Sequence, residues 1–189
     1  MIFKPLVLLF FITTSAFASG FMQVANFTKI HGTVLSSKEK LKTGDELTEG
    51  MEITIPKKGD FAEIKFQNGH IIRFAESSVL VVTLNPKNTL LNLKKGKVFS
   101  AIKPLTQNET FEIKTKRLSS KALGTKFLLE ETKKQSYLFV NEGVVLVKST
   151  KGEVEVKKDE DLTSGNLKAS LATKNMIRTT GLVFSEMLK

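Results

Sequence analysis

The chain has no cysteine among its 189 residues. Disulfide bonds, thiolate zinc sites, cysteine nucleophiles and attached c-type haem are therefore excluded. A lipid-modified cysteine behind an export signal is excluded for the same reason. If the chain is exported, it is expected to be a soluble protein rather than a lipoprotein.

Side chains suited to metal and acid–base chemistry are scarce. Neither of the two histidines, His31 and His70, has a second histidine or a carboxylate at a metal-binding spacing. The G-x-S-x-G elbow and the glycine-rich phosphate loop are also missing. Residues 159–161 form an acidic turn that lacks the alternating oxygen ligands of a calcium loop. We predict no catalytic residue, no cofactor and no metal; the remaining enzymatic alternative is a hydrolase or lyase whose carboxylates converge from distant segments.

Aromatic side chains with a polar edge are nearly absent, since the chain has no tryptophan and Tyr137 is its single tyrosine. Exported β modules that hold polysaccharide often stack sugars on such rings, so this composition disfavours a stacking sugar site. Ten of the 14 phenylalanines follow residue 18. At alternating strand positions they are typical of core packing rather than of base stacking, and no nucleic acid partner is predicted.

The N-terminus has the pattern of a secretory signal. A positive start at residues 1–4 precedes a short apolar run at 6–12 and a small-x-small site at 16–18. The apolar run is too short for a spanning helix of about 20 residues. We predict a signal peptide over 1–18, a periplasmic or secreted mature chain, and no transmembrane segment after cleavage; the alternative is an uncleaved N-terminal anchor.

Basic residues outnumber acidic ones, 29 to 19, which gives a formal net charge of +10. A stretch from 114 to 126 contains no acidic residue. It suggests a surface for an anionic partner such as lipid headgroups, acidic glycan or an acidic protein face, with a solvated strand face as the alternative. The candidate partner surface consists of Lys114, Lys116, Arg117, Lys121 and Lys126.

Two polar residues and a glycine interrupt an alternating apolar pattern at 67–69, 94–96 and 141–143. Three-residue hairpin loops often end in a residue with left-handed backbone, which glycine adopts easily. We therefore predict a hairpin at each place. For the first, a loop at 67–69 sets Ile64 opposite Ile72, and Glu63 opposite Arg73, so both faces are chemically consistent.

The flanks of the third predicted hairpin, 137–140 and 144–147, are apolar on both faces, so a second sheet or the C-terminal tail should cover them. Strand patterns recur about every ten residues, and Pro56, Pro86 and Pro104 fall between them.

Because of this spacing, the fold class predicted is all-β, an antiparallel sandwich or short β-helix-like meander of about ten to twelve strands. Residues 166–189 are expected to form a C-terminal tail, either a terminal helix or a docked segment. Strands are expected at 24–35, 51–55, 61–66, 71–74, 79–84, 90–93, 98–102, 111–115, 123–130, 137–140, 144–147 and 154–156.

The turn elements, taken in order, resemble the FecR domain family. The most specific part is Gly124-Thr125-x-Phe127 followed by Glu142-Gly143-x-Val145. Asp159 stands where the family has a glycine that opens the last turn. The resemblance assigns residues 19–165 to a FecR-like β domain. The other matching segments are 32–34, 41–47, 50–53, 62–69, 93–98 and 111–115.

Well-known FecR proteins combine a cytoplasmic segment that binds a sigma factor, one membrane helix and an external domain. Because a signal peptide is expected at the start of this chain, the resemblance implies the exported module rather than direct sigma-factor control. The hypothesis is a non-enzymatic periplasmic sensory or scaffolding module for signal transduction that binds another envelope protein. The alternative is a module that binds peptidoglycan or another anionic envelope polysaccharide. The matched residues implied to be structural are Gly44, Asp45, Gly69, Gly124, Thr125 and Gly143, with Asp45 and Thr125 as side-chain hydrogen-bond formers in turns.

Overall fold

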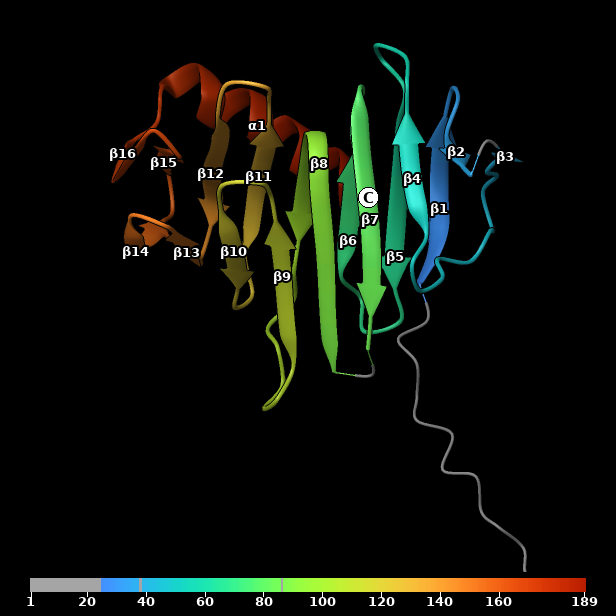
Figure 1. Cartoon of the computed structure of the whole chain (residues 1–189), viewed down its shortest axis with the longest axis horizontal. Coiled ribbons are helices and arrows are strands. Elements are labelled where there is room, and N and C mark those ends of the chain that lie inside the picture. The colour runs from blue at the N-terminus through green and yellow to red at the C-terminus, as the bar shows by residue number, and fades with distance from the viewer. Residues whose placement is uncertain (1–24, 38, 86) are drawn as a thin grey trace, which may run out of the picture.

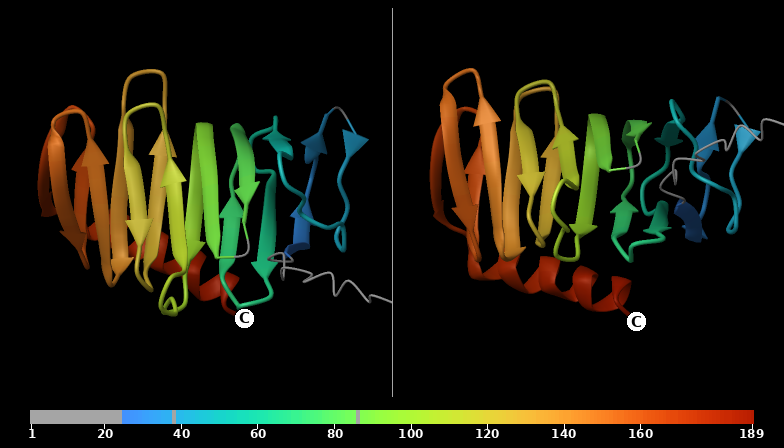
Figure 2. Two further views of the ribbon diagram at one scale, coloured as in Figure 1. Left: turned by 60° about the horizontal axis from the view of Figure 1, so that its bottom comes forward. Right: turned by 90° about the horizontal axis from the view of Figure 1, so that it is seen from below.

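A computed structural model describes residues 25–37, 39–85 and 87–189. The predicted signal peptide lies outside these residues. The described chain forms sixteen strands and one helix in two stacked layers, with the helix lying across the strands of one layer (Figures 1 and 2). The all-β class with a C-terminal helix is therefore confirmed, although the strands exceed the ten to twelve expected because β2, β3, β10, β15 and β16 were not anticipated as separate strands.

The two layers share the long strand β8 (Asn88–Ala101), so that all sixteen strands belong to one hydrogen-bonded network. All strand pairs are antiparallel except that β8 and β9 run parallel. Layer A contains, in spatial order, β1 (Ala25–His31), β5 (Phe61–Phe66), β6 (Ile71–Phe74), the C-terminal half of β8, β11 (Lys126–Glu131), β12 (Ser136–Glu142), β15 (Glu160–Thr163) and β16 (Asn166–Leu171). Layer B contains β3 (Glu39–Lys40), β2 (Leu35–Ser36), β4 (Glu52–Ile55), β7 (Ser78–Leu84), the N-terminal half of β8, β9 (Thr110–Lys114), β10 (Ser119–Ala122), β13 (Val144–Ser149) and β14 (Gly152–Lys157).

The first predicted hairpin has the predicted register. β5 and β6 pair Ile64 with Ile72 and Glu63 with Arg73, and Gly69 has φ +84°. Ile64 and Ile72 point into the core, whereas Glu63 and Arg73 lie on the outer face of layer A. The loop at 67–69 is confirmed because only this register keeps apolar and charged side chains on separate faces.

The second predicted hairpin is wrong. Residues 94–96 lie inside β8, whose first half pairs with β7 and β9 and whose second half pairs with β6 and β11. Gly96 has φ +98°, and an added Cβ there would overlap the Cα atom of Ser78. The side chain of Ser78 also accepts a hydrogen bond from the Lys97 N–H, at 3.0 Å. The glycine therefore marks the point where one continuous strand passes between the two layers.

The third predicted hairpin is also wrong, because β12 and β13 belong to different layers. β12 pairs with β11 and β15, whereas β13 pairs with β10 and β14. Gly143 between them has φ +85° and packs against Thr125, so the chain turns from layer A to layer B. The expected covering of this region is confirmed, since Phe139 is fully buried and the helix contacts β12.

The core lies between the two layers, as the alternation of apolar residues predicted. Phenylalanines supply much of its volume, and seven of them are almost fully buried. Each fully buried side chain of this size stabilises the fold by roughly 1.5–3 kcal/mol relative to leaving it exposed. The seven are Phe27, Phe66, Phe74, Phe111, Phe127, Phe139 and Phe184.

The segment after Gly165 packs on the β domain. Its first part is β16, which pairs with β15, and its second part is the helix α1 (Lys174–Met187). Thr173 caps the helix by accepting the Met176 N–H at 3.2 Å. Phe184 and Met187 pack against Ala101 of β8, on the outer face of layer A. Among the described residues, no helix is long and apolar enough to cross a membrane.

Candidate functional site

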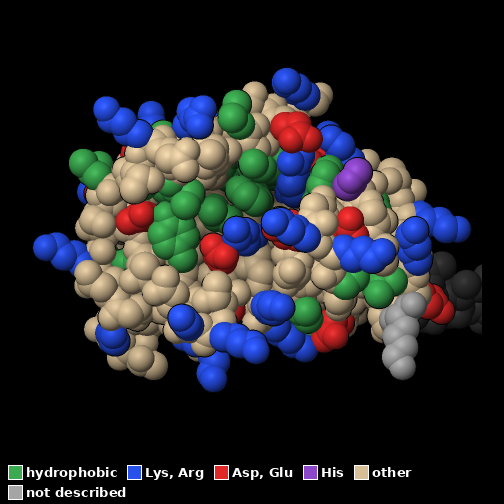
Figure 3. All heavy atoms as spheres, turned by 90° about the horizontal axis from the view of Figure 1, so that it is seen from above, with side chains coloured by type: hydrophobic (Ala, Val, Ile, Leu, Met, Phe, Trp, Pro, Cys, Tyr) green, Lys and Arg blue, Asp and Glu red, His purple; other side chains and the backbone are tan. Residues whose placement is uncertain are grey.

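The predicted basic stretch does not form one surface. Lys114 and Lys121 lie on the outer face of layer B, and Lys116 is exposed in the turn that joins β9 to β10. Lys126 lies on layer A, where it forms an ion pair with Glu142. The stretch divides because the chain changes layer between β10 and β11. In the space-filling view of Figure 3, basic side chains are likewise spread over the visible face, with acidic and hydrophobic ones among them.

Arg117 has structural contacts rather than a free guanidinium. It forms an ion pair with the buried Glu131 and donates to the carbonyl oxygen of Lys133 at 2.8 Å. Glu131 also accepts a hydrogen bond from Ser136, whose hydroxyl lies 2.9 Å from that of Thr115. This network ties the β9–β10 turn to the β11–β12 turn. Arg117 is therefore unsuited to the partner surface proposed for it from the sequence.

The residues that the FecR resemblance marks as structural lie in turns and close contacts. Asp45 accepts the Lys42 N–H at 2.7 Å, as expected for a turn residue. Thr125 differs from its expected role, since its buried hydroxyl has no hydrogen-bond partner among the described residues. Its methyl group packs against Gly143 instead. Asp159, where the resemblance places a glycine, has a left-handed backbone with φ +63°. The four glycines have positive φ: Gly44, Gly69, Gly124 and Gly143.

The two histidines lie in unlike surroundings. His31 is exposed and stacks on Phe61 at 5.5 Å between ring centroids. His70 is buried between the rings of Phe66 and Phe111, and its Nδ1 accepts the Lys103 N–H at 3.1 Å. Burial lowers the pKa of His70. His70 therefore has a structural role, as a buried neutral imidazole that accepts a backbone hydrogen bond.

Mild acid should destabilise the protein through His70. Because the folded-state pKa is lowered, the unfolded chain takes up a proton first as the pH falls below its unfolded pKa of about 6.5. The stability contributed by neutral His70 is complete above that pH and is lost as the pH falls towards the folded pKa. We expect His70→Asn to lose less unfolding free energy between pH 7 and pH 5 than wild type, measured by urea unfolding. An equal slope in His70→Asn and wild type would contradict the prediction.

A charged cluster holds the C-terminal end of α1 on layer A. The buried Arg73 donates its Nε–H to Glu63 at 2.7 Å, and its Nη1 lies 3.1 Å from a carboxylate oxygen of Glu186 on the helix. Lys29 pairs with the same Glu186 at 3.3 Å, and the Arg73 guanidinium lies over the Phe61 ring at 4.6 Å. The Arg73 bond lowers the pKa of Glu186. Two cations and two carboxylates therefore compensate one another in this cluster.

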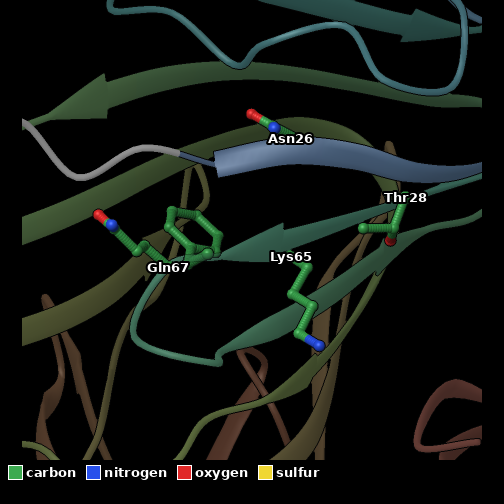
Figure 4. Close-up of a pocket in the computed structure, with 5 residues that line it drawn as sticks. Asn26, Thr28, Lys65 and Gln67 are labelled. Carbon is green, nitrogen blue, oxygen red and sulfur yellow. The ribbon is translucent and has the colours of Figure 1, made fainter.

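Beside this cluster, a groove runs over the outer face of layer A. It consists of three neighbouring hollows that share Lys65 of β5. One hollow lies at the β1–β5 edge, where Figure 4 shows Asn26, Thr28, Lys65 and Gln67 around it. The other two lie against the C-terminal end of α1, where Leu188 lines both. We call this surface the Lys65 groove.

The Lys65 groove has a basic rim and an apolar floor. Lys65, Lys103 and Lys126 surround the hollow next to Gly69, and Ile71, Ala101, Ile102 and Leu188 complete its lining. Sequence analysis missed Lys65 and Lys103 as site residues. The predicted register of the first hairpin contained a signal for Lys65, because it placed this residue on the same face as Glu63. No sequence signal connected Lys103 to it.

The structure thus defines a two-layer β protein with a terminal helix and a basic surface groove. Within the described ranges, no group of three or more histidine, aspartate or glutamate side chains is placed to hold a metal ion. These features define the class of the protein: it is a β domain that offers surface grooves and sheet faces to a binding partner.

Comparison with known proteins identifies the family. The sequence model described as "FecR protein" matches residues 52–146, from the start of β4 into β13. This is half of the chain, and the protein therefore belongs to the FecR family. No curated protein sequence matches the chain.

Two solved structures have a similar fold. Each is a crystal structure of a "putative anti-sigma factor" from Parabacteroides distasonis ATCC 8503, with 16% sequence identity to this chain. One, at 2.50 Å resolution, has a TM-score of 0.54 and covers 63% of this chain and 57% of its own. The other, at 1.65 Å, has a TM-score of 0.59 and covers 72% and 65%, respectively. At this identity the likeness shows the fold, and the chain spans less than two thirds of either neighbour.

Proposed function

We propose that this protein is an exported, non-catalytic sensory or scaffolding module that binds another protein of the cell envelope. The observation that carries the proposal is the FecR match over 52–146, which includes strands of both layers. The names of the two structural neighbours support a role related to signalling. Export is supported by the signal pattern of residues 1–18. The domain would then act through its surfaces rather than through a reactive centre.

The proposal is testable by fractionation and crosslinking in cells. A photo-crosslinking amino acid is introduced at Gln67, which lines one hollow of the Lys65 groove, or at Lys116, in the β9–β10 turn. Both side chains are exposed, so the fold should tolerate the change. We expect the chain in the osmotic-shock fraction and a discrete protein adduct from one of the two positions. Retention of the chain in the cytoplasm, or adducts only to cell-wall material, would contradict the proposal.

Binding to an anionic envelope polymer is the second candidate, favoured by the excess of basic residues and by the exposed Lys114 and Lys116 on layer B. Its test is co-sedimentation with purified cell wall at low and high salt, because exposed charges are screened by salt. The triple variant Lys114→Glu, Lys116→Glu and Lys121→Glu leaves the structural Arg117 intact. Strong, salt-sensitive sedimentation that this variant loses would favour the polymer over the protein partner.

A further inference from the structure

One cross-strand row on the outer face of layer A places two lysines on either side of small and apolar residues. Strand pairing aligns Lys65 of β5 with Ile71 of β6, Ile71 with Ala101 of β8, and Ala101 with Lys126 of β11. Neighbouring strands lie about 4.8 Å apart, so the backbones of Lys65 and Lys126 are separated by three strand spacings, roughly 14 Å. The row therefore has the order basic, apolar, apolar, basic.

A third lysine borders this row. Lys103 follows β8, and its stem crosses Gly69 so closely that a Cβ added there would lie 2.8 Å from Nζ. Lys65 and Lys103 are exposed and have no acidic partner among the described residues, whereas the neighbouring Arg73 cluster is balanced in charge. Within the described ranges, Lys126 pairs with the exposed Glu142. Lys65 and Lys103 thus carry positive charge that no ion pair of the described residues neutralises, and the Lys126–Glu142 pair lies open to solvent at the other end of the row.

The helix limits where a ligand can lie. Phe184 and Met187 of α1 cover Ala101 in the middle of the row. Figure 2 shows that the axis of α1 runs across the strands. The row of paired residues also runs across the strands, so the helix and the row have the same direction. The open space therefore lies along the flank of the helix, between Leu188 and the loops that carry Gly69 and Lys103. An elongated ligand that follows the helix would contact the lysines and the apolar floor together.

We propose that the Lys65 groove binds an extended acidic segment of the partner protein, with two carboxylates four residues apart and an apolar side chain midway. An extended chain rises about 3.4 Å per residue, so residues four apart project to the same side roughly 14 Å from each other. That spacing matches the separation of Lys65 and Lys126 in the row. The apolar side chain midway along the bound segment would contact Ile71 and Leu188. Lys103 would add a charge-assisted hydrogen bond to whichever of the segment's two carboxylates lies nearer to it.

This inference rests on the proposed function, because it assumes a protein partner, and it names the kind of segment that the partner presents. The full chain is titrated into a fluorescein-labelled threonine peptide with two glutamates four residues apart and a leucine midway. A second peptide has the same composition but adjacent glutamates. We expect anisotropy changes with the first peptide at low salt, and weaker binding both at high salt and with the second peptide.

Two double variants with the same change in net charge separate the groove from general electrostatics. Lys65→Glu with Lys103→Glu should weaken binding by roughly tenfold or more. Lys114→Glu with Lys116→Glu, on the other side of the molecule, should change it by less than about twofold. If the first pair fails to fold, as judged by circular dichroism, Lys65→Gln with Lys103→Gln replaces it and should still weaken binding.

Equal losses in the two double variants, or no preference between the two peptides, would overturn the groove proposal. So would binding to anionic phosphatidylglycerol vesicles through Lys65 and Lys103 without any binding of the spaced peptide, since that result would assign the groove to a lipid surface. Failure of peptide binding together with a discrete protein adduct in cells would reject the groove but leave the proposed function standing. If neither Gln67 nor Lys116 gives a protein adduct in the cell crosslinking experiment, the proposed function itself is rejected.

Discussion

Gly96→Ala should destabilise the protein by about 3 kcal/mol or more, a large effect for the addition of one methyl group. Gly96 has φ +98°, which an L-residue adopts only with strain. Its added Cβ would also overlap the backbone of Ser78, which cannot move away as a flexible side chain would. Because Gly96 is where β8 passes between the layers, the strain falls on the strand that joins them. Urea unfolding followed by far-ultraviolet circular dichroism measures the loss.

Gly44→Ala is the matched control for this prediction. Gly44 has φ +97°, almost the same as Gly96, but no atom lies within 4 Å of a Cβ added there. Its substitution should therefore show the backbone strain alone, about 1–2 kcal/mol. The difference between the two variants isolates the clash with Ser78. Equal losses would show that the close approach of β7 and β8 at Gly96 does not constrain the fold.

Arg73→Met should destabilise the protein by about 3–5 kcal/mol, because it leaves the buried Glu63 carboxylate without its cation. Arg73 and Glu63 are almost fully buried and share two hydrogen bonds. Arg73 also holds Glu186, so the variant should release the C-terminal end of α1 as well. Urea unfolding gives the total loss, and hydrogen exchange of the helix amides should show faster opening near residue 186.

The double variant Arg73→Met with Glu63→Leu tests the cause of that loss. It removes the uncompensated charge, so stability should recover to within about 1–2 kcal/mol of wild type. Lys94→Met is a second control, because it breaks the exposed ion pair with Glu52 and should lose no more than about 1 kcal/mol. A double variant as unstable as Arg73→Met alone would assign the loss to packing of the arginine side chain rather than to the buried carboxylate.

The three glycine-containing interruptions show where local sequence is informative and where it is ambiguous. At 67–69, both flanking strands have a polar and an apolar face, and one register alone keeps those faces separate. At 94–96 and 141–143 the same residue pattern accompanies a strand that crosses between layers and an arch between layers. Each of these structures requires a left-handed glycine. The choice among them depends on which distant strands pair, and nearby residues do not contain that information.

The candidate site illustrates the same division. A run of basic residues from 114 to 126 is contiguous in the sequence, yet Arg117 turns towards Glu131 and Lys126 lies on the opposite layer from Lys114. The Lys65 groove takes its lysines from β5, the segment after β8, and β11. Strand alternation predicts which face a residue occupies within its own sheet. It does not predict which strands become neighbours.

By itself, the sequence determined the all-β class, the register of the β5–β6 hairpin, the burial of seven of the phenylalanines and the resemblance to the FecR family. These properties depend on alternation, turn glycines and motif order, which are all local along the chain. The tertiary structure alone decided the crossing of β8, the division of the basic stretch, the Arg73 cluster beneath α1 and the assembly of the Lys65 groove. These features depend on contacts between residues far apart in the sequence. Which of the alternative strand pairings is most stable is decided by the packing of the whole chain, and no short segment contains that information.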